Sequence, residues 1–119
     1  MTKGFIASIF AYLILGASAA SATPGSATSA TVAKMTIVRA YGNFVFVHLR
    51  TPPTVRSACA TNSYWHFTLS LDDSAGKNMY AQLLAAFSSG SLLDISGTDA
   101  CSEFGTIESI GGLGLSDGS

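Results

Sequence analysis

The sequence predicts a small, mainly β domain that contains one helix. Apolar residues recur at helical spacing over residues 74–89, and Gly90 follows where a helix C-cap favours glycine. The segments on either side alternate between apolar and polar residues, as strands do. The predicted order is therefore three strands, a helix capped by Ser74, and two strands. This is the order of the OB-fold, a five-stranded Greek-key barrel, so we expect an OB-like barrel (β-β-β-α-β-β). The alternatives are an open sheet crossed by one helix and a split barrel of other connectivity.

Residues 1–22 are expected to be a secretory signal peptide. Lys3 precedes an apolar run, and the small residues after it end in Ala20-Ser21-Ala22, an A-x-A cleavage pattern. The apolar run is shorter than the ~20 residues that a membrane-spanning helix needs, which disfavours the alternative of a membrane anchor. We therefore expect cleavage after Ala22, with cleavage after Ala19 as the alternative, a secreted or periplasmic protein, and no membrane span once the signal is removed.

The strands before the helix are predicted to begin with a hairpin. Residues 23–33 are small and polar and are expected to be a flexible segment before the barrel domain, 34–115. Gly42-Asn43 is a turn signal, and the strand after it, FVFVHL, is apolar on both faces. One face would fill the barrel, and the helix or another subunit would cover the other. The predicted strands are 34–41, 44–49, 64–71, 92–97 and 106–110.

Two cysteines, Cys59 and Cys101, lie in the loops before the third strand and after the fourth. An even number of cysteines in an exported chain favours a disulfide. A reactive thiol beside His48 or His66 is the alternative, but no Cys-His family signature surrounds either cysteine. Neither C-x-x-C nor H-x-x-x-H spacing occurs, so no metal or other cofactor is predicted.

The charge of the mature chain disfavours nucleic acid as a partner. Without Lys3 it has five basic and seven acidic side chains, a net charge of −2, and no basic run. A domain of this size has a small core, so we expect it to need a disulfide, a partner subunit, or both.

The third predicted strand, YWHFTLSL, supplies candidate binding residues. Trp65 shares a face with Phe67 and Leu69, so we interpret it as a core residue, with a sugar-stacking platform as the alternative. Tyr64 and His66 are expected on the opposite face, toward solvent or a subunit interface. Rings cover apolar sugar faces, whereas amide and guanidinium groups bond to sugar oxygens. The predicted ligand-binding residues are Arg56, Asn62, Tyr64 and His66. The alternative is an ordinary solvated strand face with no ligand.

The segment 83–110 carries a family resemblance. It combines a helix ending in A-x-x-x-G, a strand ending in G-T, the second cysteine, and G-x-x-E-x-I. In this pattern the chain resembles the receptor-binding B subunits of subtilase-cytotoxin-like AB5 toxins. The resemblance implies an OB-fold, assembly into a pentameric ring, and binding of cell-surface glycans, often sialylated. It carries no glycan-binding motif that maps onto individual residues here.

We therefore predict a glycan-binding, ring-forming secreted subunit that is not an enzyme. A monomeric periplasmic or extracellular module that binds or inhibits a protein is the alternative. A small hydrolase that uses Asp99, Glu103 or Glu108 is disfavoured, because these carboxylates lie on or near one loop and no second wall of a pocket is identifiable.

Overall fold

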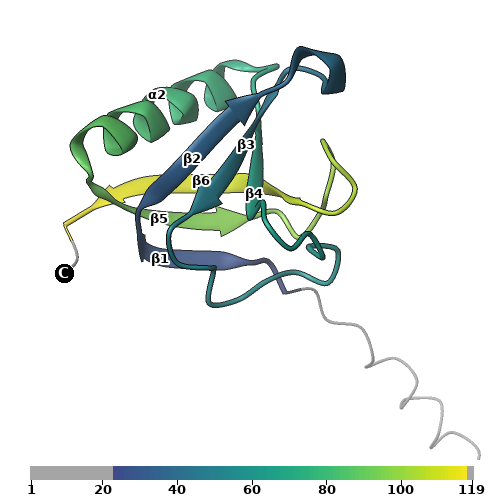
Figure 1. Cartoon of the computed structure of the whole chain (residues 1–119), viewed down its shortest axis with the longest axis horizontal. Coiled ribbons are helices and arrows are strands. Elements are labelled where there is room, and N and C mark those ends of the chain that lie inside the picture. The colour runs from purple at the N-terminus through teal and green to yellow at the C-terminus, as the bar shows by residue number, and fades with distance from the viewer. Residues whose placement is uncertain (1–22, 118–119) are drawn as a thin grey trace, which may run out of the picture.

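The computed structural model describes residues 23–117 and shows a curled, barrel-like sheet with one long helix (Figure 1). The signal peptide expected at 1–22 lies outside the described residues. Within the described part of the chain, no helix has the length and apolar character to cross a membrane. The elements are β1 (Ser26–Ala30), β2 (Val32–Ile37), a 3₁₀ helix (Arg39–Tyr41), β3 (Phe44–Leu49), β4 (Phe67–Ser70), α2 (Ser74–Ser89), β5 (Leu92–Gly97) and β6 (Glu108–Ser116).

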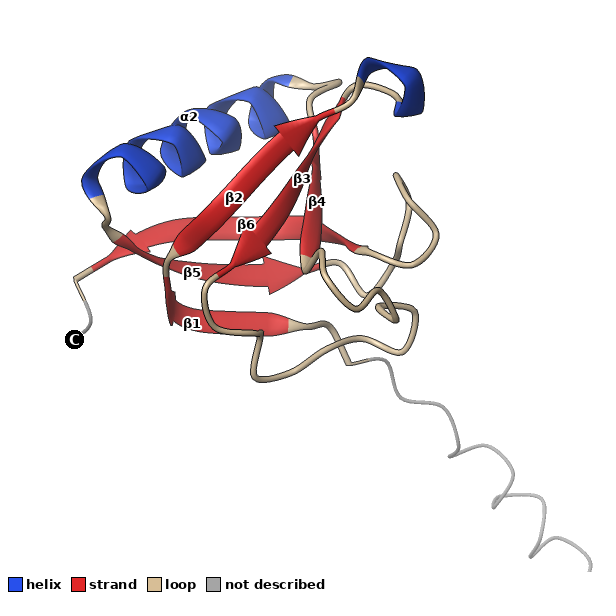
Figure 2. Cartoon of the chain, viewed as in Figure 1, coloured by secondary structure: helices blue, strands red, loops and turns tan. Residues whose placement is uncertain are grey.

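The sheet closes in the manner of an OB-fold. Its strand order is β1-β5-β6-β4-β3-β2, and all neighbours are antiparallel except β4 and β6 (Figure 2). The two edge strands, β1 and β2, are separated in sequence only by Thr31. Counted as one bent strand, they join both edges and give five strands in a barrel, which confirms the predicted fold class. Counted separately, the strands number six rather than five.

The N-terminal segment differs from its prediction. Residues 23–33, expected to be flexible, contain β1 and the start of β2. Ala27 and Ala30 are buried, and β1 pairs with β5. Small side chains give no apolar alternation that would mark a strand, so the backbone pairing with β5 was not visible in the sequence.

The helix confirms its predicted place and its C-cap but not its N-cap. Gly90 adopts the left-handed conformation at φ 73°. Asp73, rather than Ser74, is the N-cap, and its Oδ1 accepts a hydrogen bond from the backbone N–H of Gly76 at 2.7 Å. A carboxylate there also interacts favourably with the positive end of the helix dipole.

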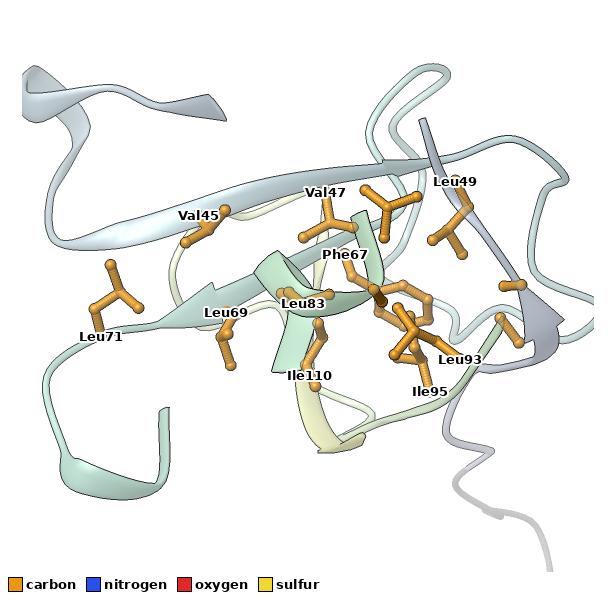
Figure 3. Packing of buried hydrophobic residues seen from close by; sticks show 14 residues of the cluster. Val45, Val47, Leu49, Phe67, Leu69, Leu71, Leu83, Leu93, Ile95 and Ile110 are labelled. Atoms are coloured by element: carbon orange, nitrogen blue, oxygen red, sulfur yellow. The ribbon is translucent and has the colours of Figure 1, made fainter. Parts of the chain in front are cut away.

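The barrel interior holds the main core (Figure 3). Val45, Val47 and Leu49 of β3 face inward at period two, and Phe67 and Leu69 of β4 meet them across the strand pair. Leu83 and Ala86 bring α2 onto this core. Leu84 and Phe87, two of the apolar residues that predict the helix, are 42% and 47% exposed. The buried stripe of α2 therefore includes only part of the apolar residues that predict the helix.

The last strand is longer than the predicted segment 106–110. A register shift between Ser96 and Gly97 leaves Gly111 as an extra residue opposite β5, which is a bulge at the glycine pair Gly111-Gly112. Beyond the bulge, the strand continues to Ser116.

The predicted disulfide is confirmed. Cys59 and Cys101 are bonded, with their Cα atoms 6.1 Å apart. The bond connects the loop between β3 and β4 to the loop between β5 and β6, and Figure 1 shows both loops at the same end of the barrel. These two loops also supply half of the candidate site described below.

Candidate ligand-binding face

A second apolar cluster lies on the outer side of β3. Because side chains alternate along a strand, Phe44 and Phe46 face away from the core that Val45 and Val47 fill. Both phenylalanines are buried, together with Ile107, against the loop between β5 and β6. The helix or another subunit was expected to cover this face, but loop residues of the same chain cover it.

Half-exposed aromatic rings surround this cluster. The ring centroid of Phe46 lies 6.0 Å from that of Tyr41, 5.4 Å from that of Phe104 and 5.3 Å from that of Trp65. Tyr41 ends the 3₁₀ helix that follows β2, Phe104 follows β5, and Trp65 precedes β4. Tyr41 is 59% exposed. We call Tyr41, Phe46, His48, Tyr64, Trp65 and Phe104 the aromatic face.

Trp65 belongs to the aromatic face rather than to the main core, which corrects the interpretation from alternation. β4 begins only at Phe67, and the residues before it are held in a turn. The Oδ1 atom of Asn62 accepts hydrogen bonds from the backbone N–H groups of Tyr64, at 2.9 Å, and Trp65, at 2.8 Å. This Asx-type turn breaks the period-two pattern, so alternation does not extend back to Trp65.

Three rings form a stack at the edge of the aromatic face. The centroids of His48 and Tyr64 are 4.1 Å apart with an interplanar angle of 3°, and those of His48 and His66 are 4.8 Å apart at 15°. The Nδ1–H of His48 donates to the carbonyl oxygen of Tyr64 at 2.7 Å. The outer ring, Tyr64, is 44% exposed.

His66 is buried, which corrects the expectation that it points to solvent. It is 6% exposed, and its Nδ1 accepts the backbone N–H of Leu49 at 2.9 Å. Burial, and then the positive charges of His48 and Arg56, lower the pKa of His66 from 6.5 to about 4. His66 is therefore neutral at pH 7 and acts as a structural acceptor.

Polar and charged groups border the aromatic face. The Lys34 ammonium lies 5.9 Å from the centre of the Trp65 ring, a cation–π contact. Arg56 donates from Nη2 to the carbonyl oxygen of Asn62 at 3.2 Å. Glu103 accepts from the Thr68 hydroxyl at 2.9 Å, and Thr68 is paired with Phe46 across β3 and β4. Apolar rings thus lie beside both donors and acceptors.

The four predicted ligand-binding residues lie near one another but differ in accessibility. Tyr64 presents an exposed ring, Arg56 is exposed, Asn62 is occupied in shaping its loop, and His66 is enclosed. Sequence reasoning missed Tyr41 and Phe104, because distant loops bring them to β3. The two-sided apolar pattern of the β3 segment was the available signal for an outer cluster.

A hollow of about 290 Å³ lies elsewhere, beside β1, β5 and β6. Its one charged lining residue is Asp94, whose Oδ1 already accepts the backbone N–H of Ser29 at 2.9 Å. Its other lining residues are small or aliphatic. We take the aromatic face as the candidate site because it combines rings, cations and a carboxylate, which the hollow does not.

The carboxylates do not form a pair facing a common pocket. Glu108 is 1% exposed, and both of its oxygens accept backbone N–H groups. Glu103 is half-buried beside Thr68. Within residues 23–117, no three His, Cys, Asp or Glu side chains gather in a group that could hold a metal ion.

The fold and the face together define a disulfide-bonded, OB-like barrel with an aromatic outer surface. No protein-family model, no curated protein and no solved structure matches the chain.

Proposed function

We propose that this protein is an exported glycan-binding domain whose aromatic face contacts the sugar. One observation supports the proposal most strongly: Tyr41, Tyr64 and Trp65 expose ring surface on the outer side of β3. In OB-folds, ligands bind on the second and third strands, between the loops that follow the first and fourth strands. Here those strands are β3 and β4, and those loops contribute Tyr41 and Phe104.

The charges around the face favour a sugar that carries a carboxylate. Lys34 lies over Trp65, Arg56 contacts the Asn62 loop, and Arg39 begins the 3₁₀ turn that ends at Tyr41. A ring can pack on the apolar side of a pyranose while a nearby cation pairs with its carboxylate. A long single-stranded nucleic acid would need a more basic groove than this weakly acidic chain provides.

Export is part of the proposal. The predicted signal peptide and the Cys59–Cys101 bond support it, because disulfides persist in oxidising compartments.

Replacing Trp65 or Tyr41 by alanine should weaken glycan binding. Loss of one ring platform removes roughly 1.4 kcal/mol of contact energy, which corresponds to about tenfold in Kd. Glycan arrays of the oxidised mature protein, residues 23–119, followed by titration with 3′-sialyllactose and lactose, measure this. Leu115→Ala is the matched control, because Leu115 is a comparably exposed apolar side chain on β6, outside the aromatic face. No array signal from folded protein, or equal losses in all three variants, would contradict the proposal.

Ring assembly remains a prediction from the resemblance. The exposed Leu84 and Phe87 on α2 leave apolar surface that a neighbouring subunit would cover. We expect a five-fold mass by light scattering on a sizing column. A clean monomer would contradict the ring and favour the alternative, a monomeric module that binds a protein, because exposed Tyr and Trp rings also suit protein interfaces.

A further inference from the structure

The Tyr64–His48–His66 stack connects a buried group to an exposed ligand-contacting ring. His66 is enclosed at one end, Tyr64 is half-exposed at the other, and His48 lies between them. Tyr64 also packs edge-on against Trp65, with ring centroids 4.9 Å apart. A movement of the His66 ring would therefore reach Tyr64 through two ring contacts and Trp65 through a third.

The buried end of the stack depends on a neutral imidazole. The Nδ1 of His66 accepts the N–H of Leu49, so this nitrogen carries no proton. Protonation would place an N–H against an N–H, and the backbone donor of Leu49, a buried residue, would lose its acceptor. The ring must then move out of the stack or remain unprotonated.

The charged surroundings oppose a cation at the position of His66. The ring of His48, from β3, lies directly against it, and Arg56, from the loop between β3 and β4, adds a positive charge. Tyr64 lies beyond His48, and Lys34 of β2 lies over Trp65. The carboxylate of Glu103, from the loop between β5 and β6, contacts Thr68. Two stacked imidazolium rings would repel each other.

We propose that this stack is a proton-operated latch, which holds Tyr64 in the aromatic face while His66 is neutral and releases it when His66 takes up a proton. The claim that glycan then dissociates rests on the proposed function; the opening of the latch does not.

The direction of the pH effect follows from linkage. The pKa of His66 is about 4 in the closed stack and would return toward 6.5 when the ring is free. The closed form binds fewer protons than the open form, so acid favours opening. The closed form of the stack is fully populated above pH 6.5, and its population is lost as the pH falls through about 4.

Trp65 is the chain's one tryptophan, so its fluorescence reports on the face without a ligand. We expect its emission to change with a midpoint near pH 4 while far-ultraviolet circular dichroism stays constant. In His66→Asn this transition should be absent, because the side-chain oxygen of asparagine can accept the Leu49 N–H without titrating. A flat wild-type titration down to pH 3.5, or an unchanged midpoint in His66→Asn, would overturn the latch.

A second variant keeps the test decisive if His66→Asn does not fold. Arg56→Gln removes a positive charge that acts against protonation of His66 and leaves the three stacked rings in place. Its Trp65 transition should move to higher pH. A midpoint that stays in place or falls would count against the latch.

A titration with glycan distinguishes the latch from the proposed glycan-binding function. With 3′-sialyllactose as probe, wild-type affinity should be about fourfold weaker at pH 3.5 than at pH 7.5, because about a quarter of the stack remains closed. In His66→Asn the affinity should not fall in this way. If Trp65 reports opening but the probe binds at neither pH, the latch stands and the proposed sialylated ligand fails. If the probe binds equally at both pH values, acid release is wrong.

Discussion

Replacing both cysteines, Cys59→Ala with Cys101→Ala, is expected to lower the free energy of unfolding by about 4 kcal/mol. The bond closes a loop with a sequence separation of 42, and its removal frees the unfolded chain from that constraint. Small domains have total stabilities of roughly 5–15 kcal/mol, so this loss would leave little margin. Urea denaturation of the oxidised wild type and the double variant measures the difference.

The same bond holds two parts of the aromatic face together. Trp65 and Tyr64 lie in the loop that carries Cys59, whereas Phe104 lies in the loop that carries Cys101. We therefore expect reduced wild-type protein to behave like the double variant, and the double variant to be insensitive to reductant. Equal urea midpoints for oxidised and reduced wild type would contradict this account.

Glu108→Ala is expected to destabilise the fold by about 3 kcal/mol. The Glu108 carboxylate accepts the backbone N–H of Gly25, at 3.1 and 3.0 Å from its two oxygens, and that of Asp99 at 2.7 Å. Its removal would leave these two donors without an acceptor and open a cavity. A side chain at Gly25 or Gly97 would overlap the carboxylate, so the surrounding backbone is fitted to it.

Glu103→Ala is the matched control for Glu108. Glu103 is the nearby half-buried glutamate, and its one described hydrogen bond comes from the Thr68 hydroxyl. Its loss should cost about 1 kcal/mol. Urea unfolding of both variants measures the contrast, and amide exchange at Gly25 and Asp99 should accelerate only in Glu108→Ala. Similar losses in the two variants would show that the buried carboxylate has no special role.

The fold was predictable where local patterns determine it. Helical spacing ending at Gly90 and alternation in the β4 and β5 segments specified the element order, and that order implied the barrel. β1 was not predicted, because Ala27 and Ala30 pack through small side chains that give no strand pattern. The strand is defined by its backbone pairing with β5. Propensity does not show where such pairing partners lie.

The site was predictable only in part. Tyr64 was identified because it is adjacent in sequence to other polar and aromatic residues. Trp65 and His66 were each assigned to the wrong environment, because the Asn62 turn delays the start of the strand to Phe67, three residues later than the pattern indicated. Tyr41 and Phe104 required the three-dimensional fold, since 62 intervening residues separate them in the chain.

The central claim, that the aromatic face binds glycan, is tested most directly by the indole Nε1–H resonance of Trp65 in a ¹H–¹⁵N spectrum. The chain has one tryptophan, so this signal is unambiguous. On addition of the strongest glycan from the array at pH 7.5, we predict a saturable shift of this resonance and of the amides of Tyr64 and Phe104. Saturable binding that leaves these signals in place and shifts residues of α2 or of the β1–β5–β6 hollow would contradict the account.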